Sequence, residues 1–478
     1  MLRIYNTLTN KKELFKPIKP SGINFFVCGP TVYDSSHIGH ARTYVFFDVA
    51  VKYLRSVGYK VFYLQNITDI DDKIINRANE LGQEPLFLSR HYTSTYFKDM
   101  EELRINSVSK YAPASKFVPQ IITQITTLIR KKYAYSTPGG VYFDITKFPQ
   151  YGKLSHQSLK ALRKAVRIEP DQNKRHDFDF VLWKARKPKE PFWKSPWASP
   201  GAGRPRGEGR PGWHIEDTAI SEHFFGPQYD IHGGGVDLKF PHHESEIAQQ
   251  ESASGKIPFV KYWMHTGHLQ VSGTKMSKSL KNFITIHDML KKHSPEAFRL
   301  LVLQNHYRSP LNYTDKSILA AEEGVRRIRE FYERLSKIPN PKSQIPNKSK
   351  IQNSNFQNDL LKKFNEAMED DFDTPKIIAE IFNFIKKTNG LIDKNSVDKK
   401  TAVSILAVFK KIDSVLGIIP KTKQEKIPEE IKKLAEKREQ YRKEKSWERA
   451  DEARKKIAEA GFIIEDTPSG PIIKKAGA

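Results

Sequence analysis

The first hundred residues alternate short apolar runs with segments of helical periodicity. β-Rich runs at 23–29 and 59–69 each precede a segment in which apolar residues recur at helical spacing. The first of these segments covers 41–58, and the second begins at Asp72. This alternation predicts a parallel sheet covered by helices, in which ligands bind in the loops that follow the strands.

The pattern changes at about Asn106. A helix, an aromatic hairpin at 133–145 and a loose basic stretch are expected there. A strand at 229–238 and a helix that opens at Pro241 then resume the α/β pattern. We therefore interpret the middle of the chain as an insertion that splits one domain in two.

Beyond about Tyr313 the chain is predicted to be helical. A segment rich in Pro, Lys, Asn and Ser at 337–355 indicates a linker or long loop, and a helical bundle follows. A second break at 418–428 precedes a helix of about two dozen charged residues and a second helix that stops at Gly461. The residues at 462–475 predict a small hairpin.

Composition adds size, compartment and charge to this picture. The 478 residues suggest about three domains at roughly 150 residues each, and no apolar run approaches the ~18 residues of a membrane span. The first residues lack the apolar core of a signal peptide, so we expect a cytoplasmic protein. Lys and Arg outnumber Asp and Glu by 80 to 55, which favours a polyanionic partner such as nucleic acid, although charge alone fits a solubility effect equally well.

Two histidines and a glycine lie between a predicted strand and a helix. At His37, Gly39 and His40, backbone N–H groups at a helix start favour a polyphosphate, and two imidazoles donate hydrogen bonds as charge grows on phosphate oxygens. Gly39 lets a purine approach the backbone. Taken alone, these residues fit an ordinary pair of helix-capping histidines better than a nucleotide site.

A second basic motif, GTKMSKSLKN at 273–282, changes that balance. Lys275 and Lys278 lie on a Gly/Ser-rich segment of the kind that closes over a triphosphate and neutralises departing pyrophosphate. A solvated lysine loop is the alternative for this segment taken singly. Paired in this order on a split α/β sheet, the two motifs favour nucleotide chemistry.

With these motifs the chain resembles the class I aminoacyl-tRNA synthetases and, within them, the cysteinyl-tRNA synthetase family. The HIGH and KMSKS motifs specify the class, and the residues around Cys28, Trp213 and the His-His-Glu segment specify cysteine. The matching segments span nearly the whole chain in the family's order and are CGPTVYDSSHIGHAR (28–42), NITDIDDKI (66–74), DFVLWKA (179–185), GRPGWHIE (209–216), DIHGGGVDLKFPHHESEIAQ (230–249), KMSKS (275–279), AMEDDFDTP (367–375) and EDTPSG (465–470).

The resemblance implies an α/β fold with a Rossmann-like catalytic domain, an inserted connective domain, a helical bundle and a small mixed α/β C-terminal domain. The expected parts are 1–105 and 206–268 for the two halves of the catalytic domain, 106–205 for the insertion, 269–316 for the KMSKS and stem-contact region, 317–420 for the anticodon-binding bundle and 421–478 for the C-terminal tRNA-binding domain.

The resemblance also implies one zinc ion, held by two cysteines, a histidine and a glutamate. The matching positions are Cys28, Asp217, His242 and Glu246, so an aspartate stands where the family has its second cysteine. The aspartate keeps the formal ligand charge but is a harder ligand, with a zinc–oxygen distance of ~2.0–2.2 Å against ~2.3 Å for sulfur. We expect zinc to be retained. In the alternative, Asp217 turns away and the site holds no metal.

The spacing of the third and fourth ligands makes independent sense. His242 and Glu246 are four residues apart and face the same way on a helix, whereas His243 at the same spacing meets only Ile247. A surface His/Glu pair is the alternative.

The other functional residues are carried over by resemblance. Gly29, Thr31, Thr68 and Trp213 are expected at the amino acid, although Trp213 could equally be a core aromatic. His37, His40, Lys275 and Lys278 are the expected catalytic residues. The expected ATP-binding residues are His37, Gly39, His40, Asp237, Lys275, Met276, Ser277, Lys278 and Ser279.

The implied reaction is activation of L-cysteine by ATP, followed by transfer to tRNA(Cys). The expected partners are ATP with Mg²⁺, L-cysteine and tRNA(Cys), and we expect a monomer without membrane contact. Two alternatives stay open, namely a homologous cysteine-activating ligase with a different acceptor and a noncatalytic RNA-binding paralogue. Intact His37, His40, Lys275 and Lys278 speak against the second alternative.

Overall fold

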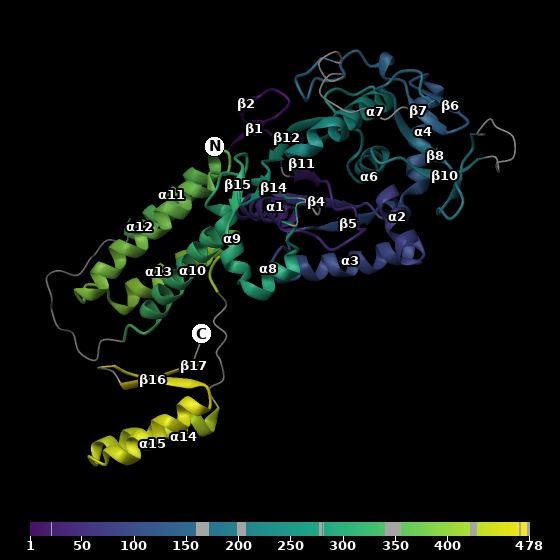
Figure 1. Ribbon diagram of the computed structural model, residues 1–478. Coiled ribbons are helices and arrows are strands. Elements are labelled where there is room, and N and C mark those ends of the chain that lie inside the picture. Colours follow the sequence, from purple (N-terminus) through teal and green to yellow (C-terminus); the bar gives the residue numbers. More distant parts are fainter. Residues whose placement is uncertain are drawn as a thin grey trace. The chain divides into compact units, whose positions relative to one another are not determined.

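The chain divides into two compact units, Met1–Ile419 and Pro420–Ala478 (Figure 1). The structure is a computed structural model. It describes residues 1–20, 22–158, 172–197, 207–276, 280, 282–339, 355–420, 428–467 and 470–475.

A five-stranded sheet organises the first unit. Its strand order is β12-β11-β3-β4-β5, and every neighbouring pair is parallel. The predicted α/β class with a Rossmann-like parallel sheet is therefore confirmed, and strands from both sides of an insertion share one sheet. The strands are β3 (Gly22–Val27), β4 (Lys60–Ile67), β5 (Lys110–Pro113), β11 (Tyr229–Gly235) and β12 (Val260–Thr266).

Three helices connect the strands of the first half, namely α1 (Ile38–Ser56), α2 (Asp72–Leu81) and α3 (Pro85–Glu102). Most of α1 is buried, because it packs on the sheet and also against α9 (Pro295–Leu303) and α13 (Lys399–Leu416). This double packing explains why the sequence of α1 is apolar on nearly all sides. It also fixes the start of α1 firmly beside the end of β3.

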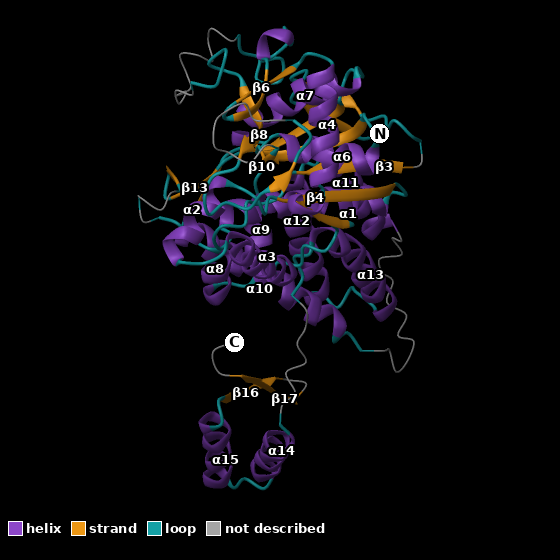
Figure 2. Ribbon diagram, turned by 90° about the vertical axis from the view of Figure 1, so that its right-hand side faces the viewer, coloured by secondary structure: helices purple, strands orange, loops and turns teal. Residues whose placement is uncertain are grey.

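The insertion contains an antiparallel sheet of order β6-β7-β8-β10-β9. The predicted hairpin forms, with Thr137 opposite Gly140 at its turn. Helix α4 (Val118–Arg130) packs against α6 (Ile215–Phe225) and α7 (Glu244–Ser254), as Figure 2 shows. The strands are β6 (Ala134–Thr137), β7 (Gly140–Phe143), β8 (Phe180–Ala185), β9 (Trp193–Lys194) and β10 (Glu208–Pro211).

The strand pairing places both edges of the insertion further along the chain than 105 and 205. Strand β5 lies after the first expected boundary but pairs with β4 of the parallel sheet. Strand β10 lies after the second expected boundary but pairs with β8 of the antiparallel sheet. Both strands are only four residues long, and such short runs carry too few positions for a periodicity to reveal their sheet.

Helices dominate the rest of the first unit. A buried ion pair joins α9 to α1, with Arg299 Nη2 3.0 Å from Asp48 Oδ2, and Arg299 Nε donates to the Leu416 carbonyl of α13 at 2.9 Å. The remaining elements are β1 (Arg3–Asn6), β2 (Lys11–Leu14), β13 (Leu269–Val271), β14 (Thr274–Lys275), β15 (Leu311–Tyr313), α8 (Ile286–Lys292), α10 (Asp315–Ser336), α11 (Asn355–Glu369) and α12 (Thr374–Asp393). Every described helix is too short or too polar to cross a membrane.

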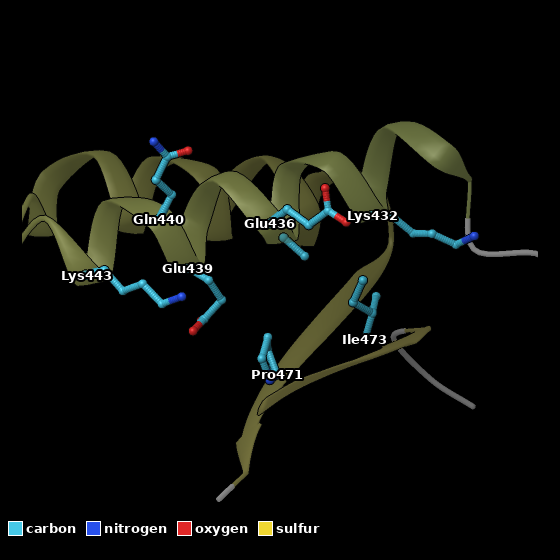
Figure 3. A pocket seen from close by; sticks show the side chains of 8 residues that line it. Lys432, Glu436, Glu439, Gln440, Lys443, Pro471 and Ile473 are labelled. Atoms are coloured by element: carbon cyan, nitrogen blue, oxygen red, sulfur yellow. The ribbon is translucent and has the colours of Figure 1, made fainter. Parts of the chain in front are cut away.

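In the second unit, the described residues form two helices and a hairpin. The predicted hairpin forms from β16 (Phe462–Thr467) and β17 (Gly470–Lys475). The charged helix is shorter than expected, because α14 (Glu429–Lys443) ends at a turn in which Lys445 has a φ of 56°. In α15 (Trp447–Glu459) Ala450, Ala453 and Ile457 are buried, whereas Trp447 is exposed. A pocket of about 520 Å³ opens between α14 and β17 (Figure 3).

Candidate active site

The start of α1 carries the first motif. His37 is the N-cap residue, and its Nδ1 accepts hydrogen bonds from the backbone N–H groups of Gly39 at 3.1 Å and His40 at 3.4 Å. His40 Nδ1 accepts in turn from the His37 N–H at 3.4 Å. A neutral imidazole whose Nδ1 accepts carries its proton on Nε2. Each ring therefore has an Nε2–H group with which to donate to a phosphate.

Burial keeps these two rings neutral. It lowers the pKa of His37 to about 4, against the opposing effect of the Asp237 carboxylate. Burial also lowers the pKa of His40 well below its usual value, and the charge of His37 acts in the same direction. The rings stack with centroids 3.8 Å apart. Asp237 is exposed in the turn that follows β11 and lies near enough to act on His37.

The second motif lies against the first as far as it is described. The Ile38 N–H donates to the Ile284 carbonyl at 3.1 Å, and the Ile284 N–H donates to Met276 Sδ at 3.4 Å. A Cβ on Gly39 would lie 2.8 Å from the His37 ring and 3.6 Å from Met276 Cε, so the space there admits only glycine. Lys275 is exposed on β14. The expected residues Ser277, Lys278 and Ser279 lie outside the described residues.

The loops after β3 and β4 lie side by side. Thr31 and Thr68 form a parallel bridge, in which the Val32 N–H donates to the Thr68 carbonyl at 3.2 Å. A Cβ on Gly29 would lie 1.7 Å from the Asn66 carbonyl oxygen, so only glycine allows this approach. The structure therefore brings three of the residues expected at the amino acid to one edge of the sheet.

The four expected zinc ligands converge beside this edge. One ligand atom from each of Cys28, Asp217, His242 and Glu246 lies within 4.8 Å of the others, and all four residues are buried. His242 Nε2 is 3.1 Å from both Asp217 Oδ2 and Glu246 Oε1. We call these four residues the carboxylate set.

Trp213 covers the outer side of this set. Its ring stacks on His242 at 4.3 Å between centroids, and 37% of its surface is exposed. The alternative of a core aromatic is therefore wrong for Trp213. Because the large ring of Trp213 lies between the carboxylate set and solvent, it can pack on a small ligand bound there.

The donor set fits a cation. Glu246 is 0% exposed, and neither of its oxygens has a hydrogen-bond partner in the described structure. Burial raises the pKa of Glu246 well above its usual value, and the negative charge of Asp217 adds to the effect. Burial and then Asp217 raise the pKa of the Cys28 thiol in the same way. A divalent cation among these groups would stabilise their charged forms and satisfy the orphaned carboxylate.

Two further histidines approach the same thiol and were not expected from the sequence. Cys28 Sγ lies 3.2 Å from His232 Nε2 and 3.0 Å from His243 Nε2. The expectation that His243 meets only Ile247 is wrong, because His243 ends a π-helical turn (Lys239–His243) that leads into α7, and its Nε2 reaches the Cys28 sulfur. Helical backbone angles begin at Pro241, directly after the non-helical Phe240, so the expected helix start at Pro241 is confirmed.

A small polar network supports Asp217. Asn66 Nδ2 donates to Asp217 Oδ1 at 2.5 Å and to Glu216 Oε1 at 3.2 Å, and Thr68 Oγ1 also donates to Glu216. All four side chains are buried. A polar residue two positions before Thr68, at a strand end, was the only sequence signal for Asn66.

Sheet and site together define a class I tRNA synthetase, and the family model of the "tRNA synthetases class I (C) catalytic domain" matches residues 14–323. A DALR domain model matches 363–420. The chain belongs to the cysteine–tRNA ligase family, as the motifs predicted. It is 43% identical to the cysteine–tRNA ligase of Thermococcus gammatolerans over 99% of both chains, and 42% identical to that of Carboxydothermus hydrogenoformans over 98% of this chain and 99% of the relative.

Solved structures agree on the fold. The methionyl-tRNA synthetase of Mycobacterium tuberculosis in complex with methionyl-adenylate superposes with a TM-score of 0.58, over 83% of this chain and 90% of that chain. Its sequence identity to this chain is 14%. The likeness therefore concerns the architecture and not the amino acid that is recognised.

Proposed function

We propose that this chain activates L-cysteine with ATP and transfers the cysteinyl group to the 3′ end of tRNA(Cys). The observation that carries the proposal is the match to cysteine–tRNA ligases over 99% of both chains. That match includes the C-terminal region, whereas the family resemblance implies that homologous ligases with another acceptor are truncated after the catalytic domain. The intact His37 and His40 at the start of α1 speak against a noncatalytic paralogue.

In the first step the cysteine carboxylate oxygen attacks the α-phosphorus of ATP, and the bond to the bridging oxygen of pyrophosphate breaks. We infer that His37 and His40 donate Nε2–H groups to phosphate oxygens on which charge grows, at a helix start that already favours anions. Lys275 and Lys278 would neutralise pyrophosphate, and Mg²⁺ would accompany ATP. The remaining expected nucleotide contacts are Gly39, Asp237, Met276, Ser277 and Ser279.

The second step transfers the cysteinyl group to RNA. A terminal ribose hydroxyl of the tRNA attacks the cysteinyl carbonyl, and AMP leaves with the mixed-anhydride oxygen. Positioning and charge stabilisation supply most of the catalysis in such transfers, so no protein nucleophile is required. We therefore assign Cys28 to ligand binding and not to covalent catalysis.

We infer that Cys28, Asp217, His242 and Glu246 would hold one zinc ion beside the amino-acid pocket of Gly29, Thr31, Thr68 and Trp213. Bound zinc would supply a strong bond to the substrate thiolate. A pocket that distinguishes side chains by size alone gives a difference in binding free energy of only about 1–3 kcal/mol, and serine differs from cysteine by one atom. The orphaned carboxylate of Glu246 supports a cation at this place.

The DALR match over 363–420 and a formal charge of +25 support tRNA as the polyanionic partner. We further propose that the enzyme works as a monomer in the cytoplasm. Sedimentation of the purified protein with and without tRNA(Cys) tests the oligomeric state directly.

Two assays on the zinc-loaded protein test the function. ATP–pyrophosphate exchange should depend on cysteine and respond little to serine, and tRNA(Cys) should become cysteinylated. Exchange without tRNA charging, but with transfer to an amino sugar, would favour the alternative ligase. Absence of cysteine-dependent exchange would favour the noncatalytic paralogue.

A further inference from the structure

A second group of possible metal ligands overlaps the carboxylate set. Ligand atoms of Cys28, His232, His243 and Glu246 also lie within 4.8 Å of one another, and all four residues are buried. We call these residues the histidine set. The two sets share Cys28 and Glu246, so a single ion cannot satisfy both at once.

The fold holds the histidine set rigidly. Cys28 directly follows β3, and its N–H donates to the Gly233 carbonyl of the neighbouring strand β11 at 3.1 Å. His232 precedes that glycine in β11 and is paired with Phe26 of β3. His243 ends the π-helical turn just before α7, three residues before Glu246.

Hydrogen bonds on the far side of each ring orient both imidazoles. His232 Nδ1 is 2.6 Å from the Tyr229 hydroxyl, and His243 Nδ1 is 2.8 Å from His265 Nε2. His265 Nδ1 is anchored in turn by the Thr7 hydroxyl at 2.9 Å. Each ring therefore presents Nε2 to the Cys28 sulfur. Metal-binding histidines are oriented by partners of this kind at their second nitrogen.

The charge and softness of the ligands favour the histidine set. The carboxylate set places three anionic ligands around a divalent ion in a fully buried site, with the Glu216 carboxyl directly beside it. The histidine set has two anionic ligands, which balance the charge of the ion, while Asp217 keeps its hydrogen bonds outside the set. It also replaces an oxygen ligand by nitrogen, which suits zinc better as a borderline-soft ion.

Asp217 has partners that do not depend on an ion. Its Oδ1 accepts from Asn66 at 2.5 Å, and its Oδ2 lies 3.1 Å from His242 Nε2. Glu246 has both oxygens without a hydrogen bond, although its Oε1 lies 3.1 Å from His242 Nε2 and its Oε2 lies 3.5 Å from His232 Nδ1. The residue that most needs a cation therefore belongs to both sets, whereas Asp217 is already satisfied.

We propose that, in the absence of cysteine, the zinc ion of this chain is bound by Cys28, His232, His243 and Glu246. Asp217 then remains hydrogen-bonded to Asn66 and His242. The inference rests on the proposed zinc dependence of the enzyme, and it concerns only the residues that hold the ion before substrate binds.

X-ray absorption spectroscopy of the full-length zinc-loaded protein without cysteine tests the proposal. The zinc spectrum should show one sulfur and the outer-shell scattering of two imidazoles. One sulfur with one imidazole would overturn the proposal, because the carboxylate set contains only His242. A protein that binds no zinc would overturn it as well.

Matched variants separate the two sets. His243→Gln should weaken zinc binding at least about 100-fold in a chelator competition, since it removes a direct ligand. His265→Gln, which removes only an orienting partner, should weaken it about 10-fold, at the lower end of the usual range for such partners. Asp217→Asn should change zinc affinity less than about 3-fold. The opposite order of His243→Gln and Asp217→Asn would overturn the proposal.

Two controls separate a change in zinc ligands from unfolding of a variant and from failure of the proposed function. Thermal unfolding of each variant shows whether the fold is intact, and the imidazole count of the unmutated protein does not depend on any variant. Cysteine-dependent exchange in a protein with a one-imidazole spectrum would defeat only this inference. Cysteine-selective exchange in a metal-free protein would defeat the zinc dependence in the proposed function.

Discussion

At the start of α1, the polar groups are backbone amides and two stacked imidazoles within four consecutive residues. Around Cys28, every polar group is a buried side chain, and the ligands come from different elements. We call His37, Gly39 and His40 the nucleotide end and the carboxylate set the amino-acid end. The nucleotide end can be recognised in a sequence because its geometry is local, whereas the amino-acid end exists only once the sheet has formed.

The two ends also differ in how they handle charge. At the nucleotide end, burial holds the imidazoles neutral, so that they serve as hydrogen-bond donors. At the amino-acid end, burial raises the pKa of Cys28 and Glu246, so that these groups need a cation to ionise. Changes at the nucleotide end should therefore lower the rate, and changes at the amino-acid end should alter metal content and selection.

The largest effect is expected for Cys28→Ala, which should lose most of its preference for cysteine over serine. Cys28 belongs to both possible ligand sets, so the variant should lose zinc. Its preference for cysteine over serine should then fall to the roughly 10- to 200-fold that a one-group difference in a pocket supplies. Zinc analysis and exchange assays with both amino acids measure this change. Unaltered zinc content together with unaltered selection would contradict the assignment.

A large rate effect without loss of metal is expected for His40→Ala. Removing one donor aimed at a developing anion costs about 10²–10³ in rate, or roughly 3–4 kcal/mol. Cysteine-dependent exchange should fall by this factor while zinc remains bound. The comparison between the two ends breaks down if His40→Ala loses zinc, because the two ends would then depend on each other.

The sequence motifs predicted which residues gather at the start of α1 and most of those that gather around Cys28. His242 and Glu246 could be paired by helical spacing, and the structure brings them together. His243 was misjudged because it lies in a π-helical turn, where the side-chain spacing of an α-helix does not apply. His232 could not be found by any local pattern, since only the parallel register of β3 and β11 places it at Cys28.

The same limit applies to the fold. Long segments such as 41–58 carry enough apolar positions to reveal a helix. Strands β5 and β10 are too short to reveal which sheet they join, and this determines where the insertion begins and ends. In both cases the missing information is tertiary, because it depends on which neighbour a short segment meets.

The free energy of unfolding should decrease at acidic pH, and His37 should account for part of this decrease. Its pKa is lowered by burial to about 4 from 6.5, so between these values the unfolded chain binds a proton that the folded chain does not. The contribution of His37 to the free energy of unfolding is therefore fully present above pH 6.5, and it decreases as the pH falls toward 4. Between pH 7 and pH 5 the loss should be about 2 kcal/mol, at about 1.4 kcal/mol per pH unit.

Urea unfolding of the unmutated protein and of His37→Gln at pH 5, 6 and 7 measures this contribution. Glutamine does not titrate, so the difference in stability between the two proteins should shrink or reverse as pH falls. Parallel pH dependences in the two proteins would show that His37 titrates alike in its folded and unfolded states. The control excludes the other buried histidines, because they are present in both proteins.

The smallest effect is expected for Asp217→Cys, which restores the ligand type that the family has at this position. The introduced thiol adds a second sulfur to Cys28, His242 and Glu246, and zinc prefers this softer set. The ion should then lie beside the amino-acid pocket even without substrate. Rejection of serine should improve by about 10-fold, which corresponds to ~1.4 kcal/mol. Exchange assays with cysteine and serine measure the ratio, and zinc absorption spectra should gain one sulfur and lose one imidazole.

Equal discrimination with a spectrum that does show two sulfurs would mean that the ligand type at 217 does not set selection. Aspartate at this position would then lower only the affinity for zinc, and the preference for cysteine over serine would depend on the pocket around Trp213 and Thr68.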